Sequence, residues 1–384
     1  MHTRSPDLRL EHLDLHDAEQ GRPKYALLKD CLLAELSSGR LGPGDPLPSE
    51  KRLADRLHVA RNTVRQAMSE LERRELIHRV PGRGTFVDQD IQRRLNNGLE
   101  LFALVTPETR TGFYPSLLHG FETASKQVQN QTIVCSTENN VDKQASAVLQ
   151  LLDKHVAGVA IVPTTNPPTP AYQIRQLHER GIPVVFCHRR VEGVHAPLVT
   201  FPFEEVGRLA GDAFAEHGHR RVAFLATHRA SAADGYLAGL RERMRAAGGD
   251  VPEEFTYHGS STSLDHARQE EPIQKALKAM FEHSSPPTAI LASFDSLAEL
   301  IYLQLGRLGL RVPEDVSLIG FGGKWREGAF VRRLTSVAVD EAQIGRHAAN
   351  LLHDIRSGNR PMDDNEEILM PLTISPGETL GPVS

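Results

Sequence analysis

The chain has 384 residues, of which 40% are hydrophobic and 24% charged, and its formal net charge is −5. This length and hydrophobic content predict about two or three compact domains and exclude a disordered or low-complexity polypeptide. The three cysteines, Cys31, Cys135 and Cys187, are odd in number and widely spaced. This excludes a disulfide framework and a zinc knuckle, and it favours a reducing, cytoplasmic location.

The first 21 residues are polar and lack the apolar core of a signal peptide, so we expect residues 1–21 to form a mobile tail. Elsewhere no apolar stretch reaches the roughly 18 residues that a membrane span needs. The composition therefore argues against an integral membrane protein.

Residues 22–88 are predicted to form a DNA-binding domain. Ser49 can accept a hydrogen bond from a free amide and so begins a short helix, which ends at a tight turn at His58. A second amphipathic helix follows over residues 61–74, with apolar residues at core spacing. This pattern is a helix-turn-helix whose outward residues lie near the start of the second helix. These residues are Arg61, Asn62, Thr63 and Arg65.

Residues 76–87 contain two short β-prone runs around the sequence Pro81-Gly82-Arg83-Gly84. Glycine and proline at this spacing predict a tight turn, and the two runs therefore form a hairpin with a cationic tip. A hairpin directly after a recognition helix is typical of a winged helix.

Three motifs in this region, LPSE, RNTVRQA and GRGTFV, resemble the GntR family of bacterial transcription regulators. The sequence departs from the family pattern at two places. Ala60 replaces the usual Ser or Thr, which removes a capping hydrogen bond worth about 1 kcal/mol. At positions 51 and 52, Lys-Arg replaces the common Arg-Glu. The resemblance implies DNA contacts from Lys51, Arg61, Asn62, Thr63, Arg65 and Gly82. We add Arg52 as a phosphate contact and Arg83 as a minor-groove contact.

The charge distribution agrees with this division of the chain. Residues 22–87 contain 13 Lys and Arg against 8 Asp and Glu, a net charge of +5. The whole chain contains 44 basic and 49 acidic residues, so the remainder carries −10. A basic domain attached to an acidic one favours phosphate binding by the first and disfavours it by the second.

After a polar linker at residues 89–100, short apolar strands alternate with amphipathic helices. Alternation of this kind predicts parallel sheets covered by helices on both faces. The expected first unit has strands at 101–107, 132–137, 158–163 and 183–188, with helices at 114–129, 141–154 and 170–180. The expected second unit has strands at 198–201, 221–227, 255–259, 289–293 and 316–321, with helices at 203–218 and 233–247.

Residues 101–376 resemble the regulatory core of the LacI/GalR repressors and of periplasmic sugar-binding proteins. The resemblance rests on GIPVVF at 181–186, GHRRVAFL at 218–225 and GLRVPEDVSLIGF at 309–321. A GntR-type reader joined to this core resembles the arabinose-repressor subfamily of GntR regulators. It implies a two-lobed, hinged sensor of doubly wound parallel sheets that dimerises and binds a small molecule in the cleft between its lobes.

The positions that hold sugar hydroxyls in this family have changed. An Arg, an Asn and an Asp of the sugar-responsive members correspond here to Tyr236, Phe294 and Gly322. Aromatic rings can stack on a ligand but cannot replace these donors and acceptors. We therefore expect free sugars to bind weakly and an effector with an apolar portion to be preferred. The candidate effector-binding residues are Phe113, Tyr114, Arg189, Tyr236, Phe294 and Asp295.

No P-loop, GxSxG or HExxH motif occurs in the sequence, and no histidine or cysteine pair has metal-ligand spacing. We therefore predict no catalytic residues, no metal and no cofactor. The sequence indicates a transcriptional repressor that binds a two-fold symmetric DNA operator as a homodimer and responds to a small-molecule effector. Two alternatives remain open: a constitutive DNA-binding protein whose core only dimerises, and an enzyme fused to a DNA-binding head.

Overall fold

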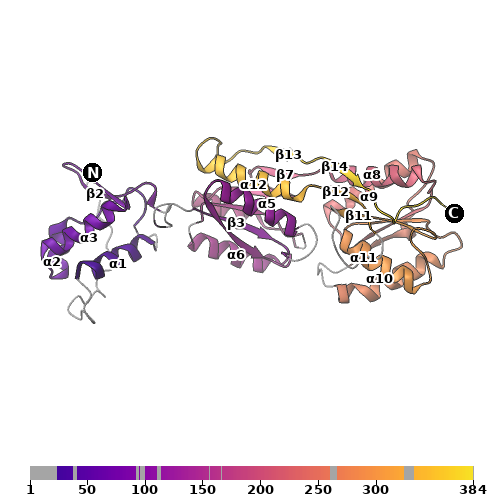
Figure 1. The fold of residues 1–384 in the computed structure, drawn as a ribbon, viewed down its shortest axis with the longest axis horizontal. Helices are drawn as coiled ribbons and strands as arrows, with labels where there is room; N and C mark the ends of the chain where they lie inside the picture. Colours follow the sequence, from indigo (N-terminus) through magenta and orange to yellow (C-terminus); the bar gives the residue numbers. More distant parts are fainter. Residues whose placement is uncertain are drawn as a thin grey trace. The chain divides into compact units, whose positions relative to one another are not determined.

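The computed structural model describes residues 24–37, 41–91, 95, 100–109, 114–154, 156–165, 167–259, 266–323 and 333–383, except for the side chains of residues 266–268. The chain divides into two compact units between Glu100 and Leu101 (Figure 1). The predicted tail, most of the predicted linker and Phe113 lie outside the described residues. No helix in the described ranges is long and apolar enough to cross a membrane.

The N-terminal unit contains helices followed by a β-hairpin. Its apolar core is formed by residues such as Leu32, Leu53 and Met68, which are fully or almost fully buried. Helix α1 precedes the predicted helix-turn-helix and packs against its second helix. The elements are α1 (Lys24–Ser37), α2 (Glu50–Leu57), α3 (Arg61–Arg73), β1 (Ile77–Val80) and β2 (Gly84–Val87).

Local sequence signals determine where α2 begins and ends. The Ser49 hydroxyl accepts a hydrogen bond from the Arg52 amide at 3.3 Å, as expected of an N-cap residue. His58 ends the helix in the left-handed conformation with φ of 50°. The predicted turn between α2 and α3 is confirmed.

The hairpin is antiparallel, with Ile77 opposite Val87 and Val80 opposite Gly84. At its tip Gly82 has a φ of 74°, a conformation that glycine adopts without strain. The segment before α2 is attached to the hairpin, because the Leu47 amide donates to the Thr85 carbonyl at 2.8 Å. Strand β2 of the wing is therefore hydrogen-bonded along both of its edges, to β1 and to the segment before α2.

The C-terminal unit has two lobes, each built on a six-stranded sheet. The first lobe has the strand order β13-β7-β6-β5-β3-β4, with β3 (Glu100–Thr106), β4 (Asn130–Ser136), β5 (Gly158–Ile161), β6 (Val184–Cys187), β7 (Leu198–Thr200) and β13 (Glu367–Leu369). Its helices are α5 (Tyr114–Gln127), α6 (Val141–Asp153), α7 (Ala171–Glu179) and α12 (Glu341–Arg356).

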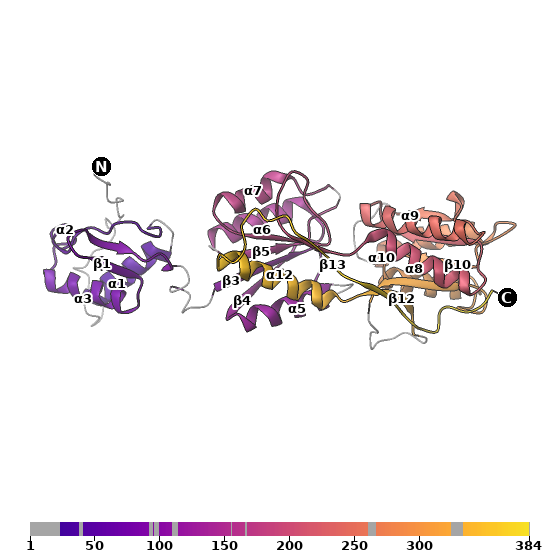
Figure 2. The same ribbon diagram turned by 90° about the horizontal axis from the view of Figure 1, so that it is seen from above.

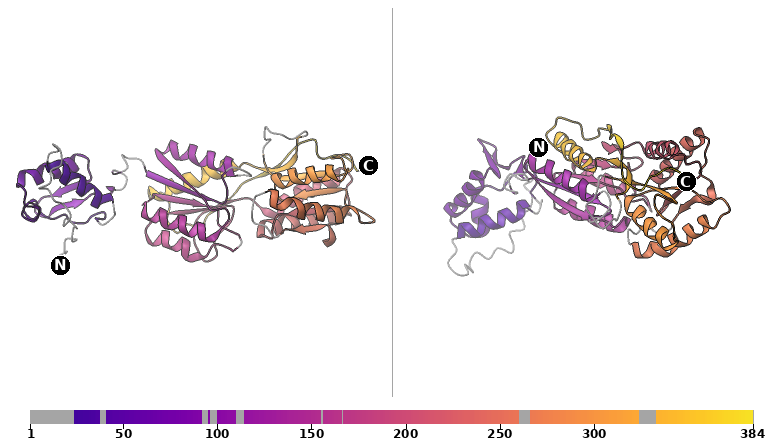
Figure 3. Two further views of the ribbon diagram at one scale, coloured as in Figure 1. Left: turned by 90° about the horizontal axis from the view of Figure 1, so that it is seen from below. Right: turned by 45° about the vertical axis from the view of Figure 1, so that its right-hand side comes forward.

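The second lobe has the strand order β14-β12-β11-β10-β8-β9 and is parallel except for β14. Its strands are β8 (Val222–Ala226), β9 (Thr256–His258), β10 (Ala289–Ala292), β11 (Ser317–Gly322), β12 (Thr335–Val339) and β14 (Leu372–Ser375). Its helices are α8 (Phe203–Glu216), α9 (Ser231–Ala246), α10 (His266–Phe281) and α11 (Asp295–Arg307), with a 3₁₀ turn at Glu253–Phe255. Helices cover both faces of each sheet (Figures 2 and 3).

The two-lobed α/β architecture is confirmed, but the boundary between the lobes differs from the prediction. Strand β7 was assigned to the second unit; it lies in the first sheet, where it pairs with β6 and β13. The chain passes between the lobes three times, after β7, after β12 and after β13 (Figure 2). These passages form the connection about which the lobes can move.

Each lobe contains one pair of helices that pack unusually closely. In the second lobe a β-carbon added at Gly207 or Gly239 would overlap the backbone of the facing helix. In the first lobe Gly120 and Gly345 bring α5 and α12 together in the same way.

Candidate functional site

Helices α2 and α3 present an exposed basic face. On α2, Lys51 and Arg52 point to solvent, whereas the following Leu53 is buried. On α3, Val64, Met68 and Leu71 are buried, and the predicted DNA-contacting residues lie on the other side. Of these, Arg61, Asn62 and Arg65 are exposed and Thr63 is half-buried.

Several of these cations have no protein partner. In the described part of the chain, the side chains of Lys51, Arg52, Arg61 and Arg83 take part in no ion pair or hydrogen bond. Arg83 is exposed beside Gly82 at the tip of the wing. Unpaired exposed cations are available for phosphate or base contacts without first breaking an internal interaction.

Arg65 differs from these cations, because Glu50 already binds it. The Arg65 Nε lies 3.3 Å from a Glu50 carboxylate oxygen, and the other oxygen lies 3.2 Å from the Arg79 guanidinium. Glu50 therefore connects the recognition helix to the wing. The sequence analysis did not single out Glu50 or Arg79, although Glu50 is the last residue of the LPSE motif.

The predicted loss of a cap at the start of α3 is confirmed. Ala60 occupies the N-cap position in an extended conformation and provides no side-chain hydrogen bond. The first-turn amides of the recognition helix therefore have no side-chain acceptor. A helix N-terminus in this state is suited to bind a DNA phosphate.

A pocket lies between the two lobes of the C-terminal unit, with about 80 Å³ of space. It is at the carboxyl ends of the parallel strands, where ligands of open α/β sheets bind. The first lobe contributes Pro107, Tyr114, Asn139, Thr165, His188, Arg189 and Phe201. The second lobe contributes Phe203, His228, Ala230, Ser231, Ala232, Ala233, Tyr236, Ser293 and Phe294.

A hydrogen bond joins the lobes across this pocket. Thr165 Oγ1 of the first lobe and His228 Nε2 of the second are 3.3 Å apart. Asn139 positions Thr165, because it donates to Thr165 Oγ1 at 2.8 Å and accepts from the Thr165 amide at 3.0 Å. Thr227 binds the other nitrogen of His228 at 3.0 Å. Burial lowers the pKa of His228, and the nearby Arg189 lowers it further.

A buried acid–base pair adjoins the pocket, of which only His188 is a lining residue. His188 Nε2 lies 3.2 Å from a carboxylate oxygen of Glu341 at the start of α12, and both side chains are more than nine-tenths buried. Tyr114 stacks on His188 with a centroid separation of 6.2 Å. Burial raises the pKa of Tyr114 and raises that of Tyr236 well above the ordinary phenol value, so that both hydroxyls remain protonated.

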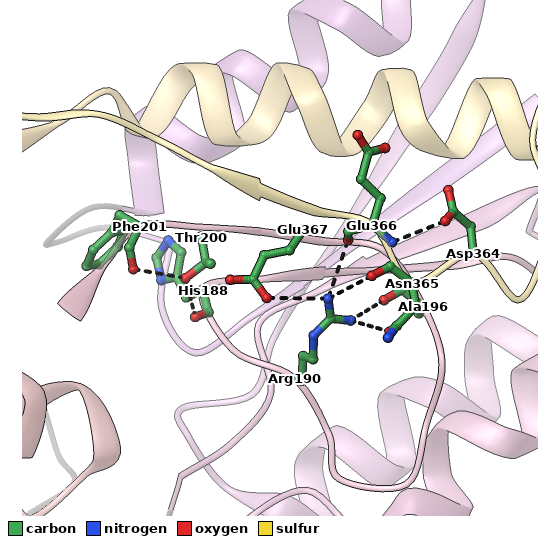
Figure 4. A network of polar contacts seen from close by, with 9 residues as sticks. All are labelled: His188, Arg190, Ala196, Thr200, Phe201, Asp364, Asn365, Glu366 and Glu367. Carbon is green, nitrogen blue, oxygen red and sulfur yellow. Dashed lines mark hydrogen bonds and ion pairs between the residues drawn. The ribbon is translucent and has the colours of Figure 1, made fainter. Parts of the chain in front are cut away.

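The loop that carries His188 and Arg189 is fixed by polar contacts to the C-terminal segment (Figure 4). Arg190 donates to the Ala196 carbonyl and to the Asn365 side chain, both at 2.7 Å. Thr200 Oγ1 donates to the His188 carbonyl at 2.7 Å. These contacts hold the loop against β13 and so position the two pocket residues that precede Arg190.

Four of the six predicted effector-binding residues line this pocket: Tyr114, Arg189, Tyr236 and Phe294. Phe113 lies outside the described residues. Asp295 is placed elsewhere, because its carboxylate accepts from the Ser336 hydroxyl at 2.7 Å and from the Gly323 amide at 3.0 Å. Asp295 thus ties α11 to the strands behind the pocket, and we no longer assign it to the ligand.

The sequence analysis missed several lining residues, although a signal for them was present. Thr165, His228 and Ser293 each follow a predicted strand closely, at the end where ligands bind. Phe203 and Ser231 begin helices that follow such strands. In the described part of the chain, no group of three or more His, Cys, Asp or Glu residues could hold a metal ion.

A winged helix with exposed cations, joined to two α/β lobes around a pocket, defines a DNA-binding regulator with a ligand-binding core. Comparison with known proteins supports this class. Residues 24–87 match the family described as bacterial regulatory proteins, gntR family, and residues 212–380 match the periplasmic binding protein-like domain. The chain is a transcription regulator that combines these two domains, and the resemblance inferred from the sequence motifs is confirmed.

Among curated proteins, the arabinose metabolism transcriptional repressor of Geobacillus stearothermophilus is 27% identical over 342 residues, which cover 87% of this chain and 91% of the relative. The repressor PurR of Proteus mirabilis is 25% identical over 67% of this chain and 74% of its own. These relatives are regulators rather than enzymes, which argues against the fused-enzyme alternative.

Solved structures show the same fold. A transcriptional regulator CelR in complex with cellobiose has a TM-score of 0.62 at 21% identity, and the match covers 87% of this chain and all of that one. The regulator CcpA of Lactococcus lactis has a TM-score of 0.61 at 17% identity, over 73% of this chain and 99% of its own. Neither the pocket nor these relatives support the alternative of a constitutive DNA-binding protein.

Proposed function

We propose that this chain is a bacterial repressor that binds a two-fold symmetric operator as a homodimer, with one winged helix in each half-site. We further propose that a small molecule in the interlobe pocket changes its affinity for the operator. The operator-binding part of this proposal rests on the exposed cations on α2, α3 and the wing, most of which have no ion-pair or hydrogen-bond partner among the described residues. A repressor of this kind acts on the chromosome and therefore in the cytoplasm.

In the proposed complex, the start of α3 enters the major groove. Arg61 and Arg65 have the reach and the donor geometry for bidentate contacts to guanine, and Asn62 can contact adenine. Thr63 lies at the edge of this surface and can bind a phosphate or a base. Glu50 holds Arg65 in an extended orientation before DNA binds, and releases it to a base edge without a large side-chain rearrangement.

The remaining contacts are to the backbone. Lys51 and Arg52 on α2 face the phosphates that flank the groove, and Arg83 beside Gly82 extends from the wing toward the minor groove. The net charge of +5 on residues 22–87 attracts DNA at separations of several ångströms. The net charge of −10 on the rest of the chain disfavours contact between DNA and that part.

The pocket supports effector control because both lobes line it. A ligand that contacts both lobes binds more tightly when the lobes are closed than when they are open. It therefore stabilises the closed conformation by the difference between its binding free energies for the two conformations. Strand β3 of the first lobe follows directly on the DNA-binding unit in sequence, so a change in lobe arrangement can be transmitted to the spacing of two DNA-binding units in a dimer.

A selection from random double-stranded DNA with the purified full-length protein tests this proposal. The expected result is an enriched sequence with inverted repeats, protected by a dimer in a footprinting experiment. An enriched site without two-fold symmetry, or one bound by a monomer, would contradict the homodimer. A failure to enrich any sequence would contradict operator binding itself.

A further inference from the structure

The wall of the interlobe pocket is rich in hydrogen-bond donors and contains no carboxylate. No aspartate or glutamate of the described ranges is among its lining residues. The buried carboxylate of Glu341 is not among the lining groups; one of its oxygens is bound by the lining residue His188, and the other has no hydrogen-bond partner among the described residues. A sugar presents several hydroxyls, for which carboxylates are the strongest fixed acceptors, and this wall offers only neutral hydroxyl, amide and imidazole acceptors. An anion requires donors and positive charge.

Arg189 provides the positive charge. Its side chain is half-buried in the pocket wall, and it forms no ion pair with any carboxylate of the described residues. It lies close enough to Tyr114 to lower the pKa of that hydroxyl, against the raising effect of burial. A guanidinium in a partly desolvated wall without a counter-ion is a strong site for a carboxylate, which it can bind through two parallel hydrogen bonds.

Ser293 supplies a second, independent indication. Its side chain is only 1% exposed, and its hydroxyl has no hydrogen-bond partner. It lies directly after β10 and lines the pocket. A buried hydroxyl without a partner is costly, and because Ser293 lines the pocket, a ligand atom that reaches this hydroxyl would satisfy it.

The start of α9 adds backbone donors on the same wall. Ala230 is its N-cap residue and offers no side-chain acceptor. The amides of Ser231, Ala232 and Ala233, which all line the pocket, have no acceptor within the helix. Together with the helix dipole, these amides favour a negatively charged group.

The rest of the pocket is aromatic. Phe201 contacts Phe203 edge-to-face with a centroid separation of 5.3 Å, and Phe203 contacts Tyr236 in the same way at 6.1 Å. Tyr114 and Phe294 complete the ring-lined surface. Rings on both sides of a narrow space select a flat, apolar body.

We propose that the effector is an aromatic carboxylate, with its carboxylate bound by Arg189, Ser293 and the start of α9 and its ring held between the two lobes. This inference rests on the proposed function, because it names the ligand class of the same pocket. A carboxylate suits the site better than a phosphorylated sugar, since the apolar rings leave sugar hydroxyls without partners.

Isothermal titration calorimetry of the full-length protein tests this proposal with four kinds of probe. Benzoate and 4-hydroxybenzoate carry an aromatic ring and a negative charge, benzyl alcohol carries the aromatic ring alone, and glucose 6-phosphate carries negative charge without an aromatic ring. Arabinose and cellobiose carry neither. We expect the aromatic acids to bind about tenfold or more tightly than any other probe, since only they satisfy both parts of the site.

Variants locate the binding site. Arg189→Gln is expected to weaken binding of the aromatic acids by about tenfold and to leave the affinity for benzyl alcohol unchanged. Ser293→Ala is expected to weaken it by about fivefold. Arg245→Gln is the matched control, because Arg245 is an exposed arginine near the far end of α9, and it should bind as the wild type does.

The proposal is overturned if neither aromatic acid binds, if a sugar or the sugar phosphate binds more tightly, or if the well-folded Arg189→Gln variant keeps the wild-type affinity for the acids. Operator binding is measured separately on the selected DNA. Intact operator binding without acid binding would refute the ligand class alone, and acid binding without operator binding would refute the regulator.

Discussion

The DNA-binding face and the interlobe pocket achieve recognition in opposite ways. The DNA-binding face is formed by exposed cations within one stretch of about 35 residues, and most of their side chains form no ion pair or hydrogen bond with the described residues. The pocket is formed by buried rings and polar groups from strands and helices of both lobes. The first site can lose a residue without structural cost, whereas residues of the second also support the fold.

This difference has a physical origin. DNA is a long polyanion whose charge acts through solvent, so that an exposed arginine can still contribute strongly to the free energy of DNA binding. A small ligand offers little area and must be removed from water, and the groups that bind it must be desolvated in advance. The predictions below test whether the two sites separate in this way, beginning with the largest expected effect.

Tyr236→Ala is expected to reduce the free energy of unfolding of the C-terminal unit by about 3–5 kcal/mol, the usual cost of removing a large buried ring. Tyr236 is 2% exposed and contacts both Phe203 and Phe321. Urea denaturation measures the change. Tyr172→Ala is the control, because Tyr172 is 58% exposed on α7 and its loss should change stability by less than about 0.5 kcal/mol. Equal effects of the two variants would show that the pocket ring has no structural role.

Arg61→Ala and Arg65→Ala are each expected to cost about 1–3 kcal/mol of operator affinity and to leave the unfolding transition unchanged. Both side chains are exposed, so their removal creates no cavity. A gel-shift titration on the selected operator measures the affinity. Arg73→Ala, at the other end of the same helix, should bind DNA as the wild type does. Wild-type affinity in both reader variants would contradict the assignment of α3 as the recognition helix.

The same contrast explains how much of the molecule could be predicted from the sequence. In the N-terminal unit the cap at Ser49, the turn at His58 and the wing glycine are local signals, and each was identified correctly. In the C-terminal unit most individual strands were found, but β7 was assigned to the wrong sheet; it lies between β6 and β13, and β13 is about 170 residues away. Nothing in the local pattern of β7 encodes that partner.

The pocket shows the same limit. Arg189 was identified because it follows an apolar strand, and Tyr236 because it occupies a position that binds sugar hydroxyls in the related repressors. The strand-end rule failed for Asp295, which also follows a strand but is bound by Ser336 from β12. Glu341, which binds the lining residue His188, begins α12, a helix that the strand-and-helix pattern did not indicate. The placement of Asp295 and of Glu341 depends on contacts between residues far apart in the sequence. The local pattern of strands and helices does not indicate such contacts.

His219 provides a smaller test, on the stability of the second lobe as a function of pH. This histidine is buried and bound by Thr288, Ser317 and the Gly381 carbonyl. Burial lowers its pKa, an effect that the Gly381 carbonyl partly opposes and the neighbouring His217 and Arg220 reinforce. Its folded pKa is therefore below the unfolded value of about 6.5. The unfolded chain binds the proton more readily, so stability is complete above that value and is lost as the pH falls toward the folded pKa.

Urea denaturation between pH 5.5 and 8 measures this loss, which is at most about 1.4 kcal/mol per pH unit for one proton. Because His178, His228 and His258 also have lowered pKa values, the relevant quantity is the change in slope between variants. His219→Gln is expected to show a shallower pH dependence than the wild type. His119→Gln, which removes an exposed histidine of α5, should keep the wild-type slope. An unchanged slope in His219→Gln would show that this histidine does not titrate on unfolding.

Salt dependence gives the smallest expected effect and the most direct comparison of the two sites. If Lys51, Arg52 and Arg83 each neutralise a phosphate, replacing any one by Gln should reduce the slope of log operator affinity against log salt concentration by about one, with little change in sequence preference. Binding of an anion at Arg189 should show a much weaker salt dependence, because that guanidinium lies in a partly buried wall and ion screening is less effective there. Titrations at several potassium chloride concentrations measure both slopes with the same protein. A ligand affinity that fell with salt as steeply as operator affinity would mean that the pocket cation behaves as an exposed charge, and the distinction between the two sites would then fail.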